Sequence, residues 1–191
     1  QLFTTFNNDT NNAIIHLASK FSISNENKIS GTLYSQGLNI DTNYNSFFFK
    51  QLDINTNNMK YELWADISNN SIKNINGALS ISKAYLNNNF NKKKVLLENI
   101  STNFKYNNYS DNLDISLTNM HAMSENNIYE NNNIFLTFNR KNLKDISIDK
   151  IYINDLMKIV KTLSFKPKKI IKSITNSLHT GVIEKLSLLD L

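Results

Sequence analysis

Alternation of apolar and polar positions is the main pattern along this chain. Between Met59 and Ile67 every second residue is apolar, and less regular runs of the same kind recur over 15–23, 29–40, 75–81, 100–106, 113–117, 134–138 and 146–153. A period of two is typical of a strand with one buried face. Clusters of Asn, Ser and Asp separate the runs. With the segment after Gly181, the pattern predicts about nine strands in a mainly β fold.

The length of these runs favours an extended sheet. Several exceed the usual strand length of about five to six residues, which indicates long antiparallel amphipathic strands rather than a compact sandwich. In one run the alternation changes phase after Gly37, so that Leu38 and Ile40 are out of step with Leu33. A glycine at a phase change predicts a bulge or bend in the strand.

The period changes near residue 154, where helical spacing begins. Asn154 or Asp155 is expected to be the N-cap of a first helix, and Pro167 suits the first turn of a second. Gly181 is expected to end the second helix before a last strand. We therefore predict one continuous domain, with a sheet over 1–154, a helical hairpin over 155–180 and a returning strand over 181–191. The two apolar helix faces are Leu156, Ile159, Val160 and Leu163, then Ile170, Ile171, Ile174 and Leu178.

Composition adds little to this interpretation. Charged residues make up 19% of the chain, the net charge is +5 and cysteine is absent, so no disulfide framework is expected. Abundant Asn, Lys and Ile indicate an AT-rich genome, so we interpret asparagine runs such as 131–133 as exposed turns. The chain starts at Gln1 and ends after an apolar run, and we expect it to be a piece of a longer protein.

Candidate chemistry is sparse. No nucleophile motif accompanies the Ser, His and Asp residues, and the histidines His16, His121 and His179 lack ligand spacing. The group around His121, with Met120, Met123 and Glu125, is interpreted as a surface loop rather than a metal site. Aromatics beside Lys105 follow from strand propensity, so no nucleic-acid partner is expected. The sequence predicts no enzyme, no cofactor and no metal.

The last fifty residues carry a family resemblance. A strand IDKIYIND runs into the amphipathic segment LMKIVKTLSF, then IIKSITNSL, a glycine turn and the strand GVIEKLSLL. This order resembles a recurring passage of the AsmA-like proteins of Gram-negative bacteria, most closely the YhdP branch. The upstream segments GTLYSQGLNI, MKYELWADI and INGALSISKAYL are similar to their amphipathic strands. The family usually has proline before the last glycine, where this chain has Thr180.

The resemblance implies a bridge-like lipid-transport protein of the periplasm. Such proteins are anchored in the inner membrane by an N-terminal helix, and further β-groove segments of the same chain continue a curved, trough-like sheet. Their partners are phospholipid acyl chains, which travel toward the outer membrane along the apolar inside. In this chain the apolar groove is expected to be lined by Ile15, Leu17, Phe21, Leu33, Leu63, Leu79, Ile81, Phe104, Ile115 and Leu136.

A structural role is the alternative. Two alternating sheets can cover each other as a sandwich core, or stack as a solenoid, in a bacterial surface or adhesion protein that has no ligand. Periodicity alone does not separate this alternative from an open sheet. The physical argument for the open sheet is that soluble proteins rarely leave a large apolar face uncovered unless it binds something.

Overall fold

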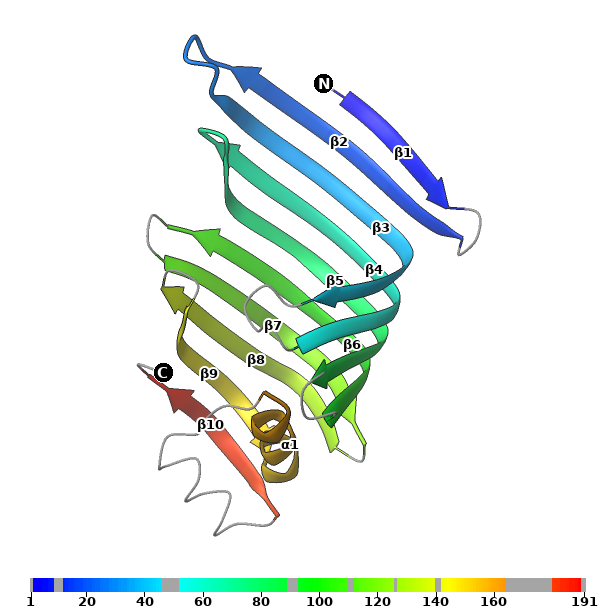
Figure 1. The fold of residues 1–191 in the computed structure, drawn as a ribbon, viewed down its shortest axis with the longest axis vertical. Coiled ribbons are helices and arrows are strands. Elements are labelled where there is room, and N and C mark those ends of the chain that lie inside the picture. The colour runs from blue at the N-terminus through cyan, green and yellow to red at the C-terminus, as the bar shows by residue number, and fades with distance from the viewer. Residues whose placement is uncertain are drawn as a thin grey trace.

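The computed structural model describes residues 2–8, 12–45, 52–88, 93–109, 112–125, 127–139, 142–163 and 180–189. They form one open antiparallel sheet of ten strands, in which each strand pairs with its neighbour in sequence (Figure 1). One helix, α1 (Ile153–Leu163), lies between the last two strands in sequence. The strands are β1 (Leu2–Asn8), β2 (Ala13–Ile23), β3 (Ile29–Asn45), β4 (Leu52–Ser68), β5 (Ser71–Asn88), β6 (Lys93–Asn108), β7 (Asn112–Ser124), β8 (Asn127–Asn139), β9 (Asn142–Tyr152) and β10 (Val182–Leu188).

This architecture confirms the mainly β fold with a short helix near the C-terminus. The expected first helix and the returning strand are present as α1 and β10. The expected second helix over 170–178 lies outside the described residues. The N-cap prediction is wrong, because α1 begins at Ile153 and so places Asn154 and Asp155 inside its first turn. β1 is a strand that the alternation did not predict.

Local asparagine chemistry shapes the hairpins. Asn69 and Asn70 connect β4 to β5 with φ angles of 52° and 62°. Two consecutive residues with positive φ are what the tight type I′ hairpin requires, and asparagine accepts this conformation better than most residues. The main-chain N–H of Asn70 donates to the carbonyl of Ile29 (3.0 Å), and the Asn70 side chain accepts from the Ile29 N–H (2.7 Å).

A line of left-handed residues crosses the sheet, which we call the crease. In a regular strand every second residue points to the same face of the sheet. In β6, however, the residues on the face that carries the buried core are Leu97 and then Ile100, and in β7 they are Leu117 and then Met120, so each step is three residues. In each case an asparagine with positive φ precedes the second inward residue. Such an insertion is a β-bulge, which bends a strand while pairing resumes on both sides. The crease consists of Asn39, Asn58, Asn99, Asn119, Asn131 and Lys185.

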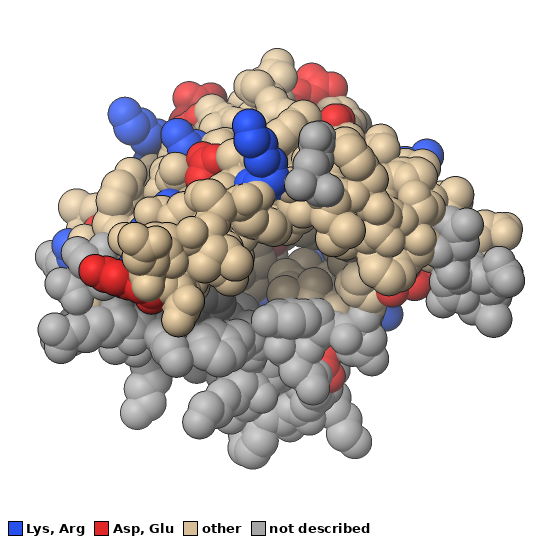
Figure 2. Space-filling model, turned by 90° about the horizontal axis from the view of Figure 1, so that it is seen from above, with Lys and Arg blue, Asp and Glu red and all other residues tan. Residues whose placement is uncertain are grey.

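The register places the crease residues along one line across the sheet, although β5 and β9 contribute none of them. Ile40 pairs with Met59, and Met120 pairs with Asn132, each next to a crease residue. The long strands β3 to β6 curve strongly in Figure 1. Seen from above, the described residues form an arch over a hollow, with charged side chains on the outside of the arch (Figure 2).

One asparagine prediction is wrong, and the prediction of a bulge after Gly37 is confirmed. Residues 131–133 are not an exposed turn but lie within β8, and Asn132 is only 2% exposed. Its side chain donates to the carbonyl of Lys150 and accepts from the Lys150 N–H, both at 2.9 Å, so it replaces main-chain pairing where the ladder is interrupted. The bulge expected after Gly37 is confirmed, because the pairing of β3 with β4 shifts between Gly37 and Ile40, and Asn39 within this segment has a φ angle of 55°.

Candidate functional site: an open apolar face

One face of the sheet carries a continuous row of residues from strand to strand. Starting from Leu63 in β4, the register connects neighbours on the same face, because directly paired residues of antiparallel strands point to the same side. We call this side the apolar face and the opposite side the polar face. The row that spans all ten strands is Thr4, Leu17, Ser35, Leu63, Gly77, Phe104, Leu117, Ile134, Ile148 and Leu186.

A second row runs parallel to the first and is more apolar. It consists of Leu2, Ser19, Leu33, Ala65, Ile75, Tyr106, Ile115, Leu136, Ile146 and Leu188. The register places all ten residues expected to line a groove on this same apolar face. Eight of them belong to the strands β2 to β6, and the other two are Ile115 in β7 and Leu136 in β8.

The apolar face is open on one side of the crease and covered on the other. Phe21, Ile23 and Ile29, at the β2–β3 end, are 45%, 70% and 40% exposed. At the crease, Ile81, Ile100 and Met120 form a buried cluster with Ala122 and Tyr129. Large apolar side chains left in solvent at the open part are costly unless something covers them. The face therefore offers apolar contact area to a ligand or a partner.

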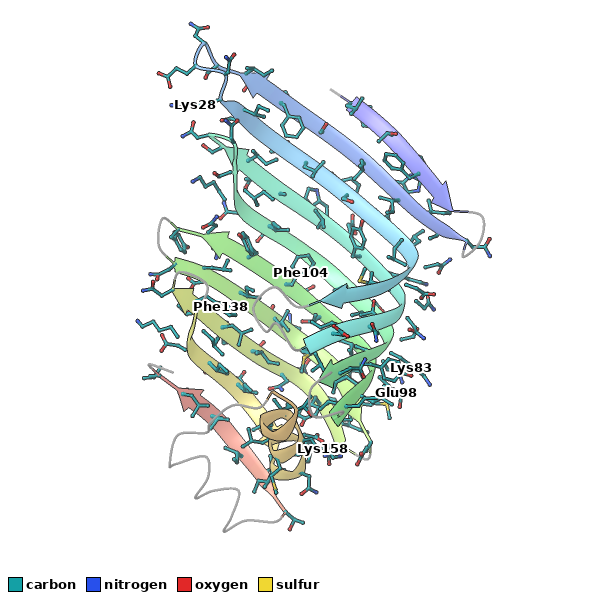
Figure 3. All side chains as sticks on the ribbon, viewed as in Figure 1. Lys28, Lys83, Glu98, Phe104, Phe138 and Lys158 are labelled. Carbon is teal, nitrogen blue, oxygen red and sulfur yellow. The ribbon has the colours of Figure 1, made fainter. Side chains whose placement is uncertain are left out.

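Glycines make the open part flat. In the register Gly31 pairs with Phe21, Gly37 with Tyr61 and Gly77 with Phe104. A Cβ atom at Gly37 would lie 2.2 Å from the Tyr61 ring, and one at Gly77 would lie 2.8 Å from the Phe104 ring. Each ring therefore lies over the main chain of the paired strand. Phe104 lies near the middle of the sheet in Figure 3, so its ring is part of the floor of the apolar face.

Helix α1 covers the other end of the apolar face. Leu156 is buried against Ile151 and Leu186, with Ile159 at the edge of the cluster. Lys158 forms an ion pair with Glu125, in the turn after β7, at 2.6 Å (Figure 3). This packing places the helix on the sheet near one end.

A buried carboxylate fixes α1 in place. Asp155, 3% exposed, accepts hydrogen bonds from the hydroxyls of Ser124 (2.9 Å) and Tyr129 (2.7 Å) and from the Asn127 side chain (3.0 Å). Burial, and then the hydrogen bond to Asp155, raise the pKa of Tyr129. Because a buried charge is tolerated only with good partners, these three donors hold the helix in one position. The only signal of this cluster in the sequence is the acidic residue Asp155 in the first turn of α1.

The polar face carries the charged side chains. Lys83 and Glu98 form an ion pair of 3.2 Å across β5 and β6 (Figure 3). His121 points to this face, whereas its neighbour Met120 is buried on the other side. Met120, His121 and Met123 therefore belong to strand β7 rather than to the surface loop that we predicted, and Met120 points to the opposite face from His121 and Met123. Among the described residues no group of three His, Cys, Asp or Glu side chains is placed to hold a metal ion.

Two further observations bear on identity. Within the described ranges no helix is long and apolar enough to cross a membrane. Comparison of the chain with protein-family models, with curated proteins and with solved structures finds no match.

Proposed function

We propose that this chain is a segment of an AsmA-like envelope protein that shields phospholipid acyl chains in an apolar β-groove. The whole protein would be anchored in the inner membrane of a Gram-negative bacterium, extend through the periplasm, and carry lipid toward the outer membrane. One observation supports this most strongly. The apolar face is continuous over ten strands, yet the described residues include no second sheet to cover it.

The dimensions of the face suit acyl chains. Neighbouring strands lie about 4.8 Å apart, so a row over ten strands extends roughly 43 Å. This exceeds the hydrocarbon thickness of a bilayer, about 30 Å, and leaves room for a whole lipid tail. Each methylene group taken out of water contributes about 0.8 kcal/mol. The flat floor made by Gly37 and Gly77 lets a chain lie along the face without specific pockets.

The competing structural role requires another covering layer. A sandwich or solenoid module would bury Phe21 and Ile23 under a second sheet, and the described residues supply none. Such a layer would have to come from a different molecule or a different segment. In that case the purified chain carries no lipid, and its apolar face binds protein.

A charge on the apolar face tests the proposal. Leu63→Asp places a carboxylate in the middle of the row, and Asn76→Asp is the matched control, because Asn76 lies one strand away on the polar face beside Gly77, the partner of Leu63. Leu63 is only partly buried, so its aspartate can reach water. We expect Leu63→Asp to cost about 1–2 kcal/mol, less than a buried unpaired charge.

The measurements are thermal unfolding and mass spectrometry of co-purified lipid. Wild type and Asn76→Asp are expected to carry phospholipid, and Leu63→Asp is expected to lose it while remaining folded. Should Leu63→Asp unfold, a photo-crosslinking amino acid at Leu117 or at its neighbour Ser116 provides the second test. Lipid adducts are expected at Leu117, which faces the apolar side, and not at Ser116. Wild-type protein without lipid, or equal crosslinking at both positions, contradicts the proposal.

A further inference from the structure

The polar face has an aromatic pair that a solvated sheet face does not need. Trp64 is the only tryptophan of the chain, and it is 52% exposed in β4. It pairs across the strands with Tyr34, their ring centroids 5.3 Å apart and their planes tilted by 51°. The Tyr34 hydroxyl donates to Glu62 (3.0 Å), which fixes the tyrosine ring. Cross-strand aromatic pairs stabilise sheets, but that role does not require a half-exposed indole.

A hollow lies directly beside this pair. Gln36 and Glu62 are the next residues of β3 and β4 on the same face, two positions from Tyr34 and Trp64, and both line this open depression, whose volume is about 390 Å³. Its floor includes the small residues Ala78 and Ser80 of β5, and Asn103 of β6 lies at its far side. This volume is within the range of small-ligand sites. Amide, hydroxyl and carboxylate groups there can both donate and accept hydrogen bonds.

The charges near the hollow nearly balance. Lys60 and Glu62 line it. Lys20, Asp66 and Lys105 point to the same face in the strands around the aromatic pair. Three cations and two anions give only a weak net attraction for phosphate chains, less than nucleic-acid sites need. An exposed indole beside neutral hydrogen-bonding groups instead suits a ligand that has an apolar face and many hydroxyls.

We propose that Trp64, Tyr34 and the adjoining hollow bind an uncharged glycan of glucose-type pyranoses. A pyranose whose substituents are all equatorial presents a flat face of C–H groups, which packs on the Trp64 ring. Hydroxyls along the glycan then point toward Gln36 and Asn103, which can both donate and accept hydrogen bonds, and toward Glu62, which accepts them. The site lies on the face opposite the apolar face, so it does not depend on the proposed lipid function. Only the identification of the glycan as an envelope polysaccharide rests on the proposed function, and binding there would leave the apolar face free.

The single tryptophan makes the site directly observable. The probe is the hexamer of β-1,4-linked N-acetylglucosamine, titrated against the purified chain while Trp64 fluorescence is recorded. We expect a saturable change in wild type. Tyr34→Ala is expected to weaken binding about tenfold or more, since it removes the second ring, and Glu62→Gln is expected to weaken it less. Trp64→Ala, followed by calorimetry, is expected to abolish the binding heat.

Phe135 provides the matched control. It is 44% exposed on the same polar face, in β8, where it pairs with Ser116 away from the hollow. Phe135→Ala is expected to leave the affinity unchanged, and a mannose hexamer, whose rings carry an axial hydroxyl, is expected to bind at least about tenfold more weakly. The proposal is overturned if wild type shows no saturable response, if Phe135→Ala matches Tyr34→Ala, or if both hexamers bind equally.

Discussion

The crease makes a sharp prediction at two neighbouring asparagines of β4. Asn57 and Asn58 are both exposed, but only Asn58 has a positive φ, of 52°. The side chain of Asp41 accepts a hydrogen bond from the Asn58 main-chain N–H (2.8 Å), and this bond survives any side-chain change at residue 58. Substitutions there therefore test the backbone conformation with little change in burial.

The magnitudes follow from the left-handed conformation. Alanine at residue 58 carries the left-handed penalty, about 1–2 kcal/mol, so Asn58→Ala is expected to lower the free energy of unfolding by about 1 kcal/mol or more. Glycine avoids that penalty but loses about 0.5–1 kcal/mol of backbone entropy. Asn58→Gly is therefore expected to remain within about 0.5 kcal/mol of wild type. Asn57 does not have a positive φ, so Asn57→Ala is also expected to change the free energy of unfolding by no more than about 0.5 kcal/mol.

Urea unfolding followed by circular dichroism measures these differences. With an unchanged slope, the midpoint shift gives the change in the free energy of unfolding. For a chain of this length, 1 kcal/mol corresponds to a shift in Tm of about 2–4 °C. If alanine at residue 58 is tolerated as well as alanine at residue 57, the crease does not rest on left-handed asparagines.

Two more predictions concern the ends and the floor of the apolar face. Asp155→Asn removes the carboxylate that accepts hydrogen bonds from Ser124 and Tyr129. It is expected to lower the free energy of unfolding by about 2–3 kcal/mol and to raise the amide hydrogen-exchange rates throughout α1. Asn154→Asp, at an exposed neighbouring residue, is the control, and unchanged exchange in α1 of Asp155→Asn would contradict the anchoring role. Gly77→Val places a side chain against the Phe104 ring and the Glu62 carbonyl. It is expected to lower the free energy of unfolding, measured by thermal unfolding, by about 1–3 kcal/mol. A stability equal to that of wild type would show that the Phe104 ring is not confined.

Alternation predicted most strands because one face of each is less exposed than the other. Met59 to Ile67 alternates cleanly and lies within β4. β1 escaped prediction because Phe3 and Phe6, three residues apart, point to opposite faces and break the period. The placement of α1 followed from its 3.6-residue spacing. The first residue of α1 could not be predicted from that spacing, because β9 runs directly into the helix at Ile153 without a separate capping residue.

The crease was hidden by composition. In the sequence the crease appears as two apolar-face residues three positions apart, with an asparagine just before the second of them. Leu97 and Ile100, with Asn99 between them, are an example. In a chain so rich in asparagine, single left-handed positions do not stand out. The Asp155 cluster was hidden by distance, because Ser124 and Tyr129 precede Asp155 by 31 and 26 residues in sequence. Only the folded sheet brings them under the helix.

The crease and the glycines together explain how a wide sheet can keep an apolar face open. Strands of up to 18 residues would twist steadily if they were regular, and the sheet would close or splay. A bulge in neighbouring strands concentrates the bend along one line instead, so the parts on either side remain regular. Gly37 and Gly77 have no side chains, so the rings of Tyr61 and Phe104 lie flat against the main chain there. Beyond the crease, Asp155 anchors α1 over the face. Among the described residues, the same sheet therefore has a covered end that stabilises the fold and an open part where Phe21, Ile23 and Ile29 are exposed.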